Sequence, residues 1–126
     1  MEKAIRNANA TNWVAQMSYS IFFYQCKIKD VVDWNTLDIE MDLGFNISHS
    51  TRVRLHGVKT PDPNAHDYVK DWVQGHKQFF IRTFIDNIGD YARTHGVIYA
   101  DETANVCLNA QLIDAGLAQP DSNKER

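Results

Sequence analysis

The stretch Arg-Val-Arg-Leu-His-Gly-Val-Lys-Thr-Pro-Asp-Pro, residues 52–63, decides both the fold and the candidate site of this chain. Val53 and Leu55 alternate with charged and imidazole side chains, which predicts a strand with one buried and one open face. Two prolines then force an extended turn. Arg54 on the open face and Asp62 in the turn could hold a phosphate, because a guanidinium fork matches two phosphate oxygens and a carboxylate could activate a water. The alternative is an edge strand with solvated charges, followed by a turn that caps a helix.

Length and composition are those of one globular domain. The chain has 126 residues, of which 44% are hydrophobic and 23% are charged, enough for a core of its own. The net charge of −3 argues against a protein that coats nucleic acid, since such proteins carry a basic excess. We find no signal-peptide pattern and no apolar run of about 20 residues, so we expect a cytoplasmic protein. Cys26 and Cys107 are expected to be buried thiols in a reducing compartment, and a disulfide between them stays open.

Alternation and turn residues predict five short strands and two helices. The strands are expected at 21–32, at 36–43, around Arg54, at 78–85 and at 96–100, with loops at 46–50 and 86–95. The first helix is expected to have Asp62 as its N-cap and to end at Gly75, and the second to end at Gly116. Three strands, a helix, two strands and a helix is the order of a small Greek-key barrel. We therefore expect an α+β, mainly β fold: a five-stranded OB-fold barrel with a helix between strands 3 and 4 and a C-terminal helix.

The domain boundaries follow from the same patterns. Residues 20–119 are expected to form the barrel domain, after an N-terminal arm at 1–19 that is weakly helical and before a flexible tail at 120–126. Trp13 in the arm is expected to pack on the barrel or to meet a partner.

Three carboxylates, Asp38, Glu40 and Asp42, alternate along the second expected strand. Alternate residues of one strand lie about 6.5–7 Å apart, which is too far for one cation to be held by all three. We therefore interpret them as a solvated face rather than a metal site.

Four segments, in the same order along the chain, resemble those of a known family. VVDWNTL (31–37) resembles V-x-D-G-D-T-x, and residues 52–62 resemble V-R-L-x-G-I-D-T-P-E. Residues 91–99 resemble Y-G-R and the strand after it, and residues 108–118 resemble L-N-x-x-L-[IV]-x-x-G-L-A. Together they make residues 22–118 similar to the staphylococcal-nuclease-like (thermonuclease) domain. Residues 42–45 are also similar to short nuclease-like proteins of phage genomes.

The resemblance implies an OB-fold barrel that hydrolyses phosphodiester bonds in DNA and RNA with one calcium ion. It places Arg54 and Arg93 on the two arginines that hold the phosphate, with Tyr91 beside the second. It also implies that the backbone carbonyl of Thr60 helps to hold calcium and that Asp33 matches the outer aspartate of the metal turn.

The departures from the family pattern affect the metal site most. Asn35 and Lys59 replace the two aspartates that ligate calcium, and Asp62 replaces a glutamate proposed to activate water. Calcium requires six to eight oxygen ligands with carboxylate charge, and these two replacements change the site by three charge units. Trp34 and Ala92 also replace glycines. We expect no cofactor here, with Lys59 standing in as a positive point charge for binding a phosphate.

Three functions stay open at this stage. The first is a nuclease-fold module without catalysis, which binds nucleic acid or an acidic protein surface between Arg54 and Arg93. One version of it is a phage-encoded inhibitor of a host enzyme. The second is a weak or metal-altered phosphodiesterase that uses Arg54, Arg93 and Asp62. In it, Asp33 or Asn35 holds a different ion, with His56 and His95 as the extra ligands nearby. The third is a structural or assembly protein that associates through the barrel and the arm at 1–19. None of the three involves a membrane.

Overall fold

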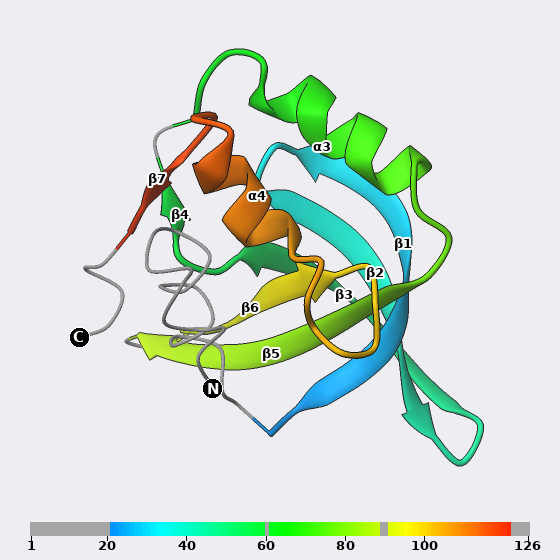
Figure 1. The fold of residues 1–126 in the computed structure, drawn as a ribbon. Helices are drawn as coiled ribbons and strands as arrows, with labels where there is room; N and C mark the ends of the chain where they lie inside the picture. The colour runs from blue at the N-terminus through cyan, green and yellow to red at the C-terminus, as the bar shows by residue number, and fades with distance from the viewer. Residues whose placement is uncertain (1–20, 60, 89–90, 122–126) are drawn as a thin grey trace, which may run out of the picture.

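The computed structural model describes residues 21–59, 61–88 and 91–121, which form a closed barrel covered by two helices (Figure 1). The barrel strands are β1 (Phe23–Asp33), β2 (Thr36–Gly44), β3 (Ile47–Leu55), β5 (Phe79–Ile88) and β6 (Tyr91–Tyr99). Their order around the barrel is β1-β2-β3-β6-β5, with β5 returning to β1. Two short strands, β4 (Val58–Lys59) and β7 (Gln119–Pro120), pair beside it. The predicted fold class, an α+β and mainly β barrel like the OB-fold, is confirmed.

The barrel interior is filled by the apolar residues of the alternating strands. On β2, Leu37, Ile39 and Met41 are buried, while the residues between them are at least partly exposed. On β3, Val53 and Leu55 are buried in the same core. Because successive side chains of a strand point to opposite faces, this burial leaves Arg52 and Arg54 on the outside of the barrel.

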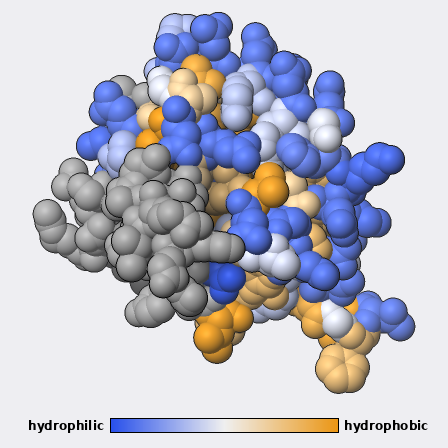
Figure 2. Space-filling model, viewed as in Figure 1, coloured by the Kyte–Doolittle hydropathy of each residue, from blue (hydrophilic) through white to orange (hydrophobic). Residues whose placement is uncertain are grey.

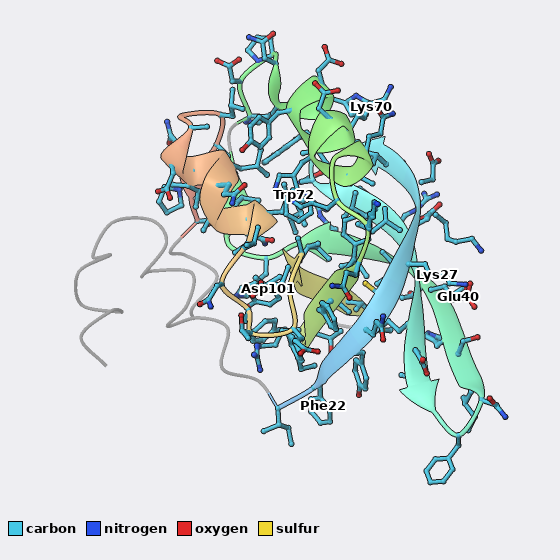
Figure 3. All side chains as sticks on the ribbon, turned by 45° about the vertical axis from the view of Figure 1, so that its right-hand side comes forward. Phe22, Lys27, Glu40, Lys70, Trp72 and Asp101 are labelled. Carbon is cyan, nitrogen blue, oxygen red and sulfur yellow. The ribbon has the colours of Figure 1, made fainter. Side chains whose placement is uncertain are left out.

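Two helices close the barrel. The helix α3 (Ala65–Gln74) buries Ala65, Val69 and Trp72, and the Trp72 indole N–H donates to Gln111 Oε1 at 2.8 Å (Figure 3). The helix α4 (Leu108–Asp114) covers an outer cluster that includes Phe80, Val97 and Tyr99.

The chain leaves α4 at Gly116, as predicted. Gly116 has φ +77°, its N–H donates to the Ile113 carbonyl, and the Leu117 N–H donates to the Leu112 carbonyl. This pair of bonds is a Schellman motif, in which glycine is favoured at the left-handed position.

Two loop predictions were wrong. Residues 86–88 and 91–95 belong to β5 and β6, whose ladder runs from Phe80↔Tyr99 to Ile88↔Tyr91. Residues 47–50 belong to β3, and the hairpin turn is only Phe45-Asn46, both with positive φ. In both places an antiparallel ladder continues through polar sequence, because its backbone hydrogen bonds do not require apolar side chains on either face.

The start of α3 was also predicted wrongly. The helix begins at Ala65 with Asn64 as its N-cap, two residues later than expected. The Asp62 carboxylate accepts a hydrogen bond from the Asn64 N–H at 2.9 Å, and its carbonyl accepts from the Ala65 N–H. This is an Asx turn before the helix, which competes with capping by the same carboxylate.

The remaining structural predictions have mixed outcomes. Cys26 and Cys107 are buried free thiols, as expected, and burial raises the pKa of each to about 12. None of the described helices is long and apolar enough to cross a membrane. The arm at 1–19 with Trp13, and residues 122–126 of the tail, lie outside the described residues.

Candidate anion-binding site

A cavity of about 280 Å³ lies where the β1–β2 turn, the end of β3, the strand β4 and β6 meet. We name it the Arg54 cavity. Its lining residues are Trp34, Asn35, Arg54, Leu55, Gly57, Val58, Lys59, His95 and Asp121. Three of the residues singled out from the sequence, Asn35, Arg54 and Lys59, are therefore brought together.

Arg54 is held at the cavity by the pairing of β3 on both sides. It lies opposite Thr36 on β2 and opposite His95 on β6. Its neighbours Val53 and Leu55 are fully or almost fully buried, which fixes the strand. Among the residues that the structure describes, no hydrogen bond or ion pair engages the exposed Arg54 guanidinium. Its five N–H donors are therefore available to an anion.

Lys59 reaches the same cavity from β4. This two-residue strand is anchored by the pairs Val58↔Pro120 and Lys59↔Gln119 and by the buried Val58. The sequence alone left open whether Lys59 points to solvent or into the site; it lines the cavity together with Arg54. Two positive side chains thus share one cavity, with Asp121 as the only carboxylate among its described lining residues.

The β1–β2 turn uses its polar groups to hold itself and β3. The Asn35 carbonyl accepts from the Leu55 N–H at 2.8 Å, and Asn35 Oδ1 accepts from the Thr36 hydroxyl at 3.0 Å. The Asp33 carboxylate accepts from the Trp34 N–H at 2.7 Å and is not among the residues that line the cavity. The turn therefore presents an amide and an indole to the cavity rather than a pair of carboxylates.

Asp62, the candidate general base, also lies apart from the cavity lining. Its carboxylate is engaged by the Asn64 N–H, and its own N–H donates to the Leu117 carbonyl at 2.9 Å. The structure therefore ties Asp62 to the segments before α3 and after α4.

The other site predictions fall largely outside the described residues. Arg93 and Tyr91 have described backbones, which pair with Asp86 and Ile88 across the β5–β6 ladder. Arg93 stands two residues before His95, the residue opposite Arg54. The side chains of Arg93 and Tyr91, and the whole of Thr60, are not described.

His95 lines the cavity, and the buried Asn109, which does not line it, holds the backbone beside it. His95 is buried, and its ring lies 6.0 Å from the His56 ring, edge to face. Asn109 on α4 is completely buried; it accepts from the Ile98 N–H and donates to the carbonyls of His56 and Gly96. One amide thus holds α4, β6 and the end of β3 in fixed relation. The L-N pair of the family resemblance marks Asn109, but its role appears only in the structure.

Calcium does not fit the donors at this cavity. Asn35 offers one neutral amide oxygen, and Lys59 brings an ammonium to the position where the family resemblance expects a carboxylate. Within the described ranges, no three His, Cys, Asp or Glu side chains come together as a possible metal site. A hard divalent cation needs several charged oxygens, whereas two cations beside an amide favour an anion.

Comparison with protein-family models and with curated proteins gives no match for this chain. The sequence also gave no signal for Asp121 at the cavity. It arrives there because β7 pairs with β4 and the Asp121 N–H donates to the Gly57 carbonyl, and a two-residue strand has no detectable periodicity.

Proposed function

We propose that the chain is a staphylococcal-nuclease-like barrel that binds single-stranded nucleic acid in the Arg54 cavity without metal-dependent cleavage. The observation that carries this proposal is that Arg54 and Lys59 line one cavity, where no described acceptor engages Arg54. A phosphate diester supplies the bidentate acceptor that a guanidinium matches, and an ammonium adds a point charge beside it.

The aromatic member of the cavity favours nucleic acid over an acidic protein segment. Trp34 is partly buried and lines the cavity next to Asn35. Proteins that bind single strands combine a cationic groove with aromatic rings on which bases stack. A glutamate-rich segment would use the two cations but would have no planar group to place on the indole.

The described lining of the cavity lacks the carboxylate that the family resemblance offers as the base. A phosphodiesterase needs a base or a metal at the attacking water. Asp62 does not line the cavity, and hydrolysis there would have to use His95 or Asp121 instead. Cleavage of the bound nucleic acid would therefore contradict the proposal.

The test is binding of a fluorescein-labelled single-stranded DNA of about 12 nucleotides, a length within the usual site size of an OB-fold, measured by anisotropy in EDTA. The variant Arg54→Ala/Lys59→Ala is compared with Lys70→Ala/Lys77→Ala, which removes the same charge from exposed positions in and after α3. We expect at least about a ten-fold loss of affinity in the first and less than about two-fold in the second.

Two further arms decide between the alternatives. Equal losses in both double variants would mean diffuse attraction to the surface and would contradict the proposal. Equally tight binding of polyglutamate would favour an acidic protein partner. Shortening of the DNA or of a matched RNA with calcium or manganese, lost in Arg54→Ala, would make the protein a phosphodiesterase instead.

A further inference from the structure

The strand β3 is paired along its whole length on one side only. On that side it pairs with β2 from Ile47 to Arg54. On the other side its described pairs are only Arg54↔His95 and Leu55↔Gly96 of β6. We name residues Ile47–Val53 of that second side the open edge; within the described ranges no strand pairs with it.

The direction of the free backbone groups follows from two hydrogen bonds. The Leu55 N–H donates toward β2, to the Asn35 carbonyl, and the His56 N–H donates toward β6, to the Gly96 carbonyl. Backbone groups alternate in direction along an antiparallel strand. The N–H and C=O groups of Ser48, Ser50 and Arg52 therefore point out of the open edge.

Within the part of the chain that the structure describes, this edge lacks the usual protection against pairing. Natural edges carry lysine, proline, a bulge or a covering element. The open edge reads Ile-Ser-His-Ser-Thr-Arg-Val, without lysine or proline. The only formally charged side chain in it, Arg52, is bound to Asp38 on β2, and residues 47–50 are exposed. Its small serines permit another strand to approach closely.

Apolar side chains gather at the same end of the molecule. Phe45 is 98% exposed, Ile47 55% and Leu43 39%, all at the tip of the β2–β3 hairpin, which projects from the barrel (Figures 1 and 2). Phe22, 54% exposed, lies directly before β1 and points away from the barrel (Figure 3). It lines a groove of about 550 Å³ together with Leu43 and His49 of the hairpin. Removing these side chains from water favours association along the open edge.

The charges on the hairpin indicate which partner fits. Its tip half carries Glu40 and Asp42 and has no lysine or arginine from 39 to 51. Its base half carries Arg52 and Arg54 against one carboxylate, Asp38, so it keeps a net positive charge. An antiparallel neighbour with the same sequence places its basic half beside this acidic half, and its acidic half beside this basic half. Because Glu40 and Asp42 lie on β2, one strand behind the contact, this attraction is long-range; it favours the antiparallel direction of pairing.

We propose that the open edge pairs antiparallel with the open edge of a second copy, forming a two-fold dimer whose barrels share one continuous sheet. In one register, every outward-pointing backbone N–H and C=O group forms a hydrogen bond to the second copy. This register places Ser50 opposite Ser50 of the second copy, and Ser48 opposite Arg52. Three residues per copy, each with one N–H and one C=O, then form about six backbone hydrogen bonds. The contact is isologous, so it closes at two copies.

The first test is the mass in solution by sedimentation equilibrium. We expect twice the 14.5 kDa chain mass, and a dissociation constant at least about ten-fold higher in Ser50→Pro and in Ser50→Lys. Proline is compatible with β3 here because the Ser50 N–H is not needed by β2. Gln74→Lys, on the exposed face of α3, adds the same charge as Ser50→Lys and is expected to leave the dimer intact.

Three results would overturn the proposal: a wild-type monomer up to about 1 mM, the range of weak association; a dimer that both Ser50 variants keep; or equal weakening by Gln74→Lys. Circular dichroism and thermal unfolding establish that each variant is folded. If Ser50→Pro unfolds, Ser50→Lys still decides the outcome.

The second test fixes the register by oxidative cross-linking. In the proposed dimer the two Ser50 Cα atoms are about 5.5 Å apart, which a disulfide can bridge. The two Ser48 residues are offset by four positions, about 13 Å. We expect Ser50→Cys to give a linked dimer and Ser48→Cys to give little, because Cys26 and Cys107 are buried thiols and remain unreactive. Equal linking at both positions would overturn the register.

Discussion

Arg52 and Arg54 lie two residues apart on β3, and both side chains are exposed. The residue opposite Arg52 on β2 is Asp38, and the two form a bidentate ion pair, with 2.8 Å from Nε to Oδ1 and 3.2 Å from a terminal nitrogen to Oδ2. The residue opposite Arg54 is Thr36, which carries no charge. The register of one β-ladder therefore gives one arginine an internal partner and leaves the other facing a cavity.

The rest of the outer face follows the pattern of Arg52. Lys29 Nζ lies 3.3 Å from Glu40 Oε1, and Lys27 is opposite Glu40 on the same face (Figure 3). The hydrogen bond from Lys29, a second one from Ser48 and the nearby lysine charges lower the Glu40 pKa. Such exposed pairs contribute little to stability, but they neutralise that face. The Arg54 cavity differs in that two positive side chains, Arg54 and Lys59, line one hollow and have no ion pair among the described residues.

The largest effect is expected beneath the cavity, at Asn109. Replacing it with alanine leaves the Ile98 N–H and the carbonyls of His56 and Gly96 without their partner in a buried position. We expect Asn109→Ala to lower the free energy of unfolding by about 3 kcal/mol or more, measured by urea unfolding. Asn64→Ala is the matched control, because the Asn64 side chain makes no cap hydrogen bond. A loss below about 1 kcal/mol at Asn109 would contradict the view that this amide holds the backbone beside the cavity.

A change in the charge of the cavity from positive to negative should make it prefer a cation to an anion. Asn35→Asp with Lys59→Asp lowers the net charge beside Arg54 by three units, because it removes one positive charge and adds two negative ones. We expect single-stranded DNA to bind about a hundred-fold more weakly and calcium to raise the melting temperature of this variant but not of the wild type. Anisotropy and thermal scans with and without EDTA measure both effects. Unchanged DNA affinity would show that the ligand binds elsewhere.

The smallest effect on stability is expected at the ion pair between Arg52 and Asp38. The hydrogen bond from Arg52 lowers the Asp38 pKa below its ordinary value of 3.8. A carboxylate whose pKa is lower in the folded than in the unfolded protein stabilises the fold at pH values above its pKa in the unfolded protein. This contribution is lost as the pH falls through its pKa in the folded protein. Asp38→Asn should therefore lower the melting temperature by about 2 °C or less near pH 7. The difference in melting temperature between wild type and Asp38→Asn should vanish in strong acid. A difference that grows as the pH falls would contradict a stabilising role of the Arg52–Asp38 pair.

The parts of the fold with clear apolar alternation were predictable from the sequence. Leu37, Ile39 and Met41 gave β2 and its buried face directly. The polar ends of β3, β5 and β6 were not predicted as strands. They are held by backbone pairing with their neighbours, and their sequence lacks the apolar alternation from which a strand is recognised. The N-cap of α3 was misplaced for a related reason: Asp62 bonds the Asn64 N–H in a turn instead of starting the helix.

The candidate site was predictable only where residues are fixed by a motif. Arg54, Lys59 and Asn35 were singled out from the family resemblance, and they line one cavity. The partner of each arginine depends on cross-strand register, which a single sequence does not specify. Asp121 depends on the β4–β7 pairing, whose two residues per strand are too few for any periodic pattern.

The most direct test of the central claim compares the two arginines of β3. Labelled single-stranded DNA is titrated with wild type, Arg54→Ala and Arg52→Ala in EDTA at three salt concentrations. We expect Arg54→Ala to weaken binding by about ten-fold and to reduce the salt slope by about 0.7, the value for one phosphate contact to a single strand. Arg52→Ala should stay within about two-fold of wild type, because that arginine is already bound to Asp38. Equal losses in the two variants, or a larger loss at Arg52, would contradict the account.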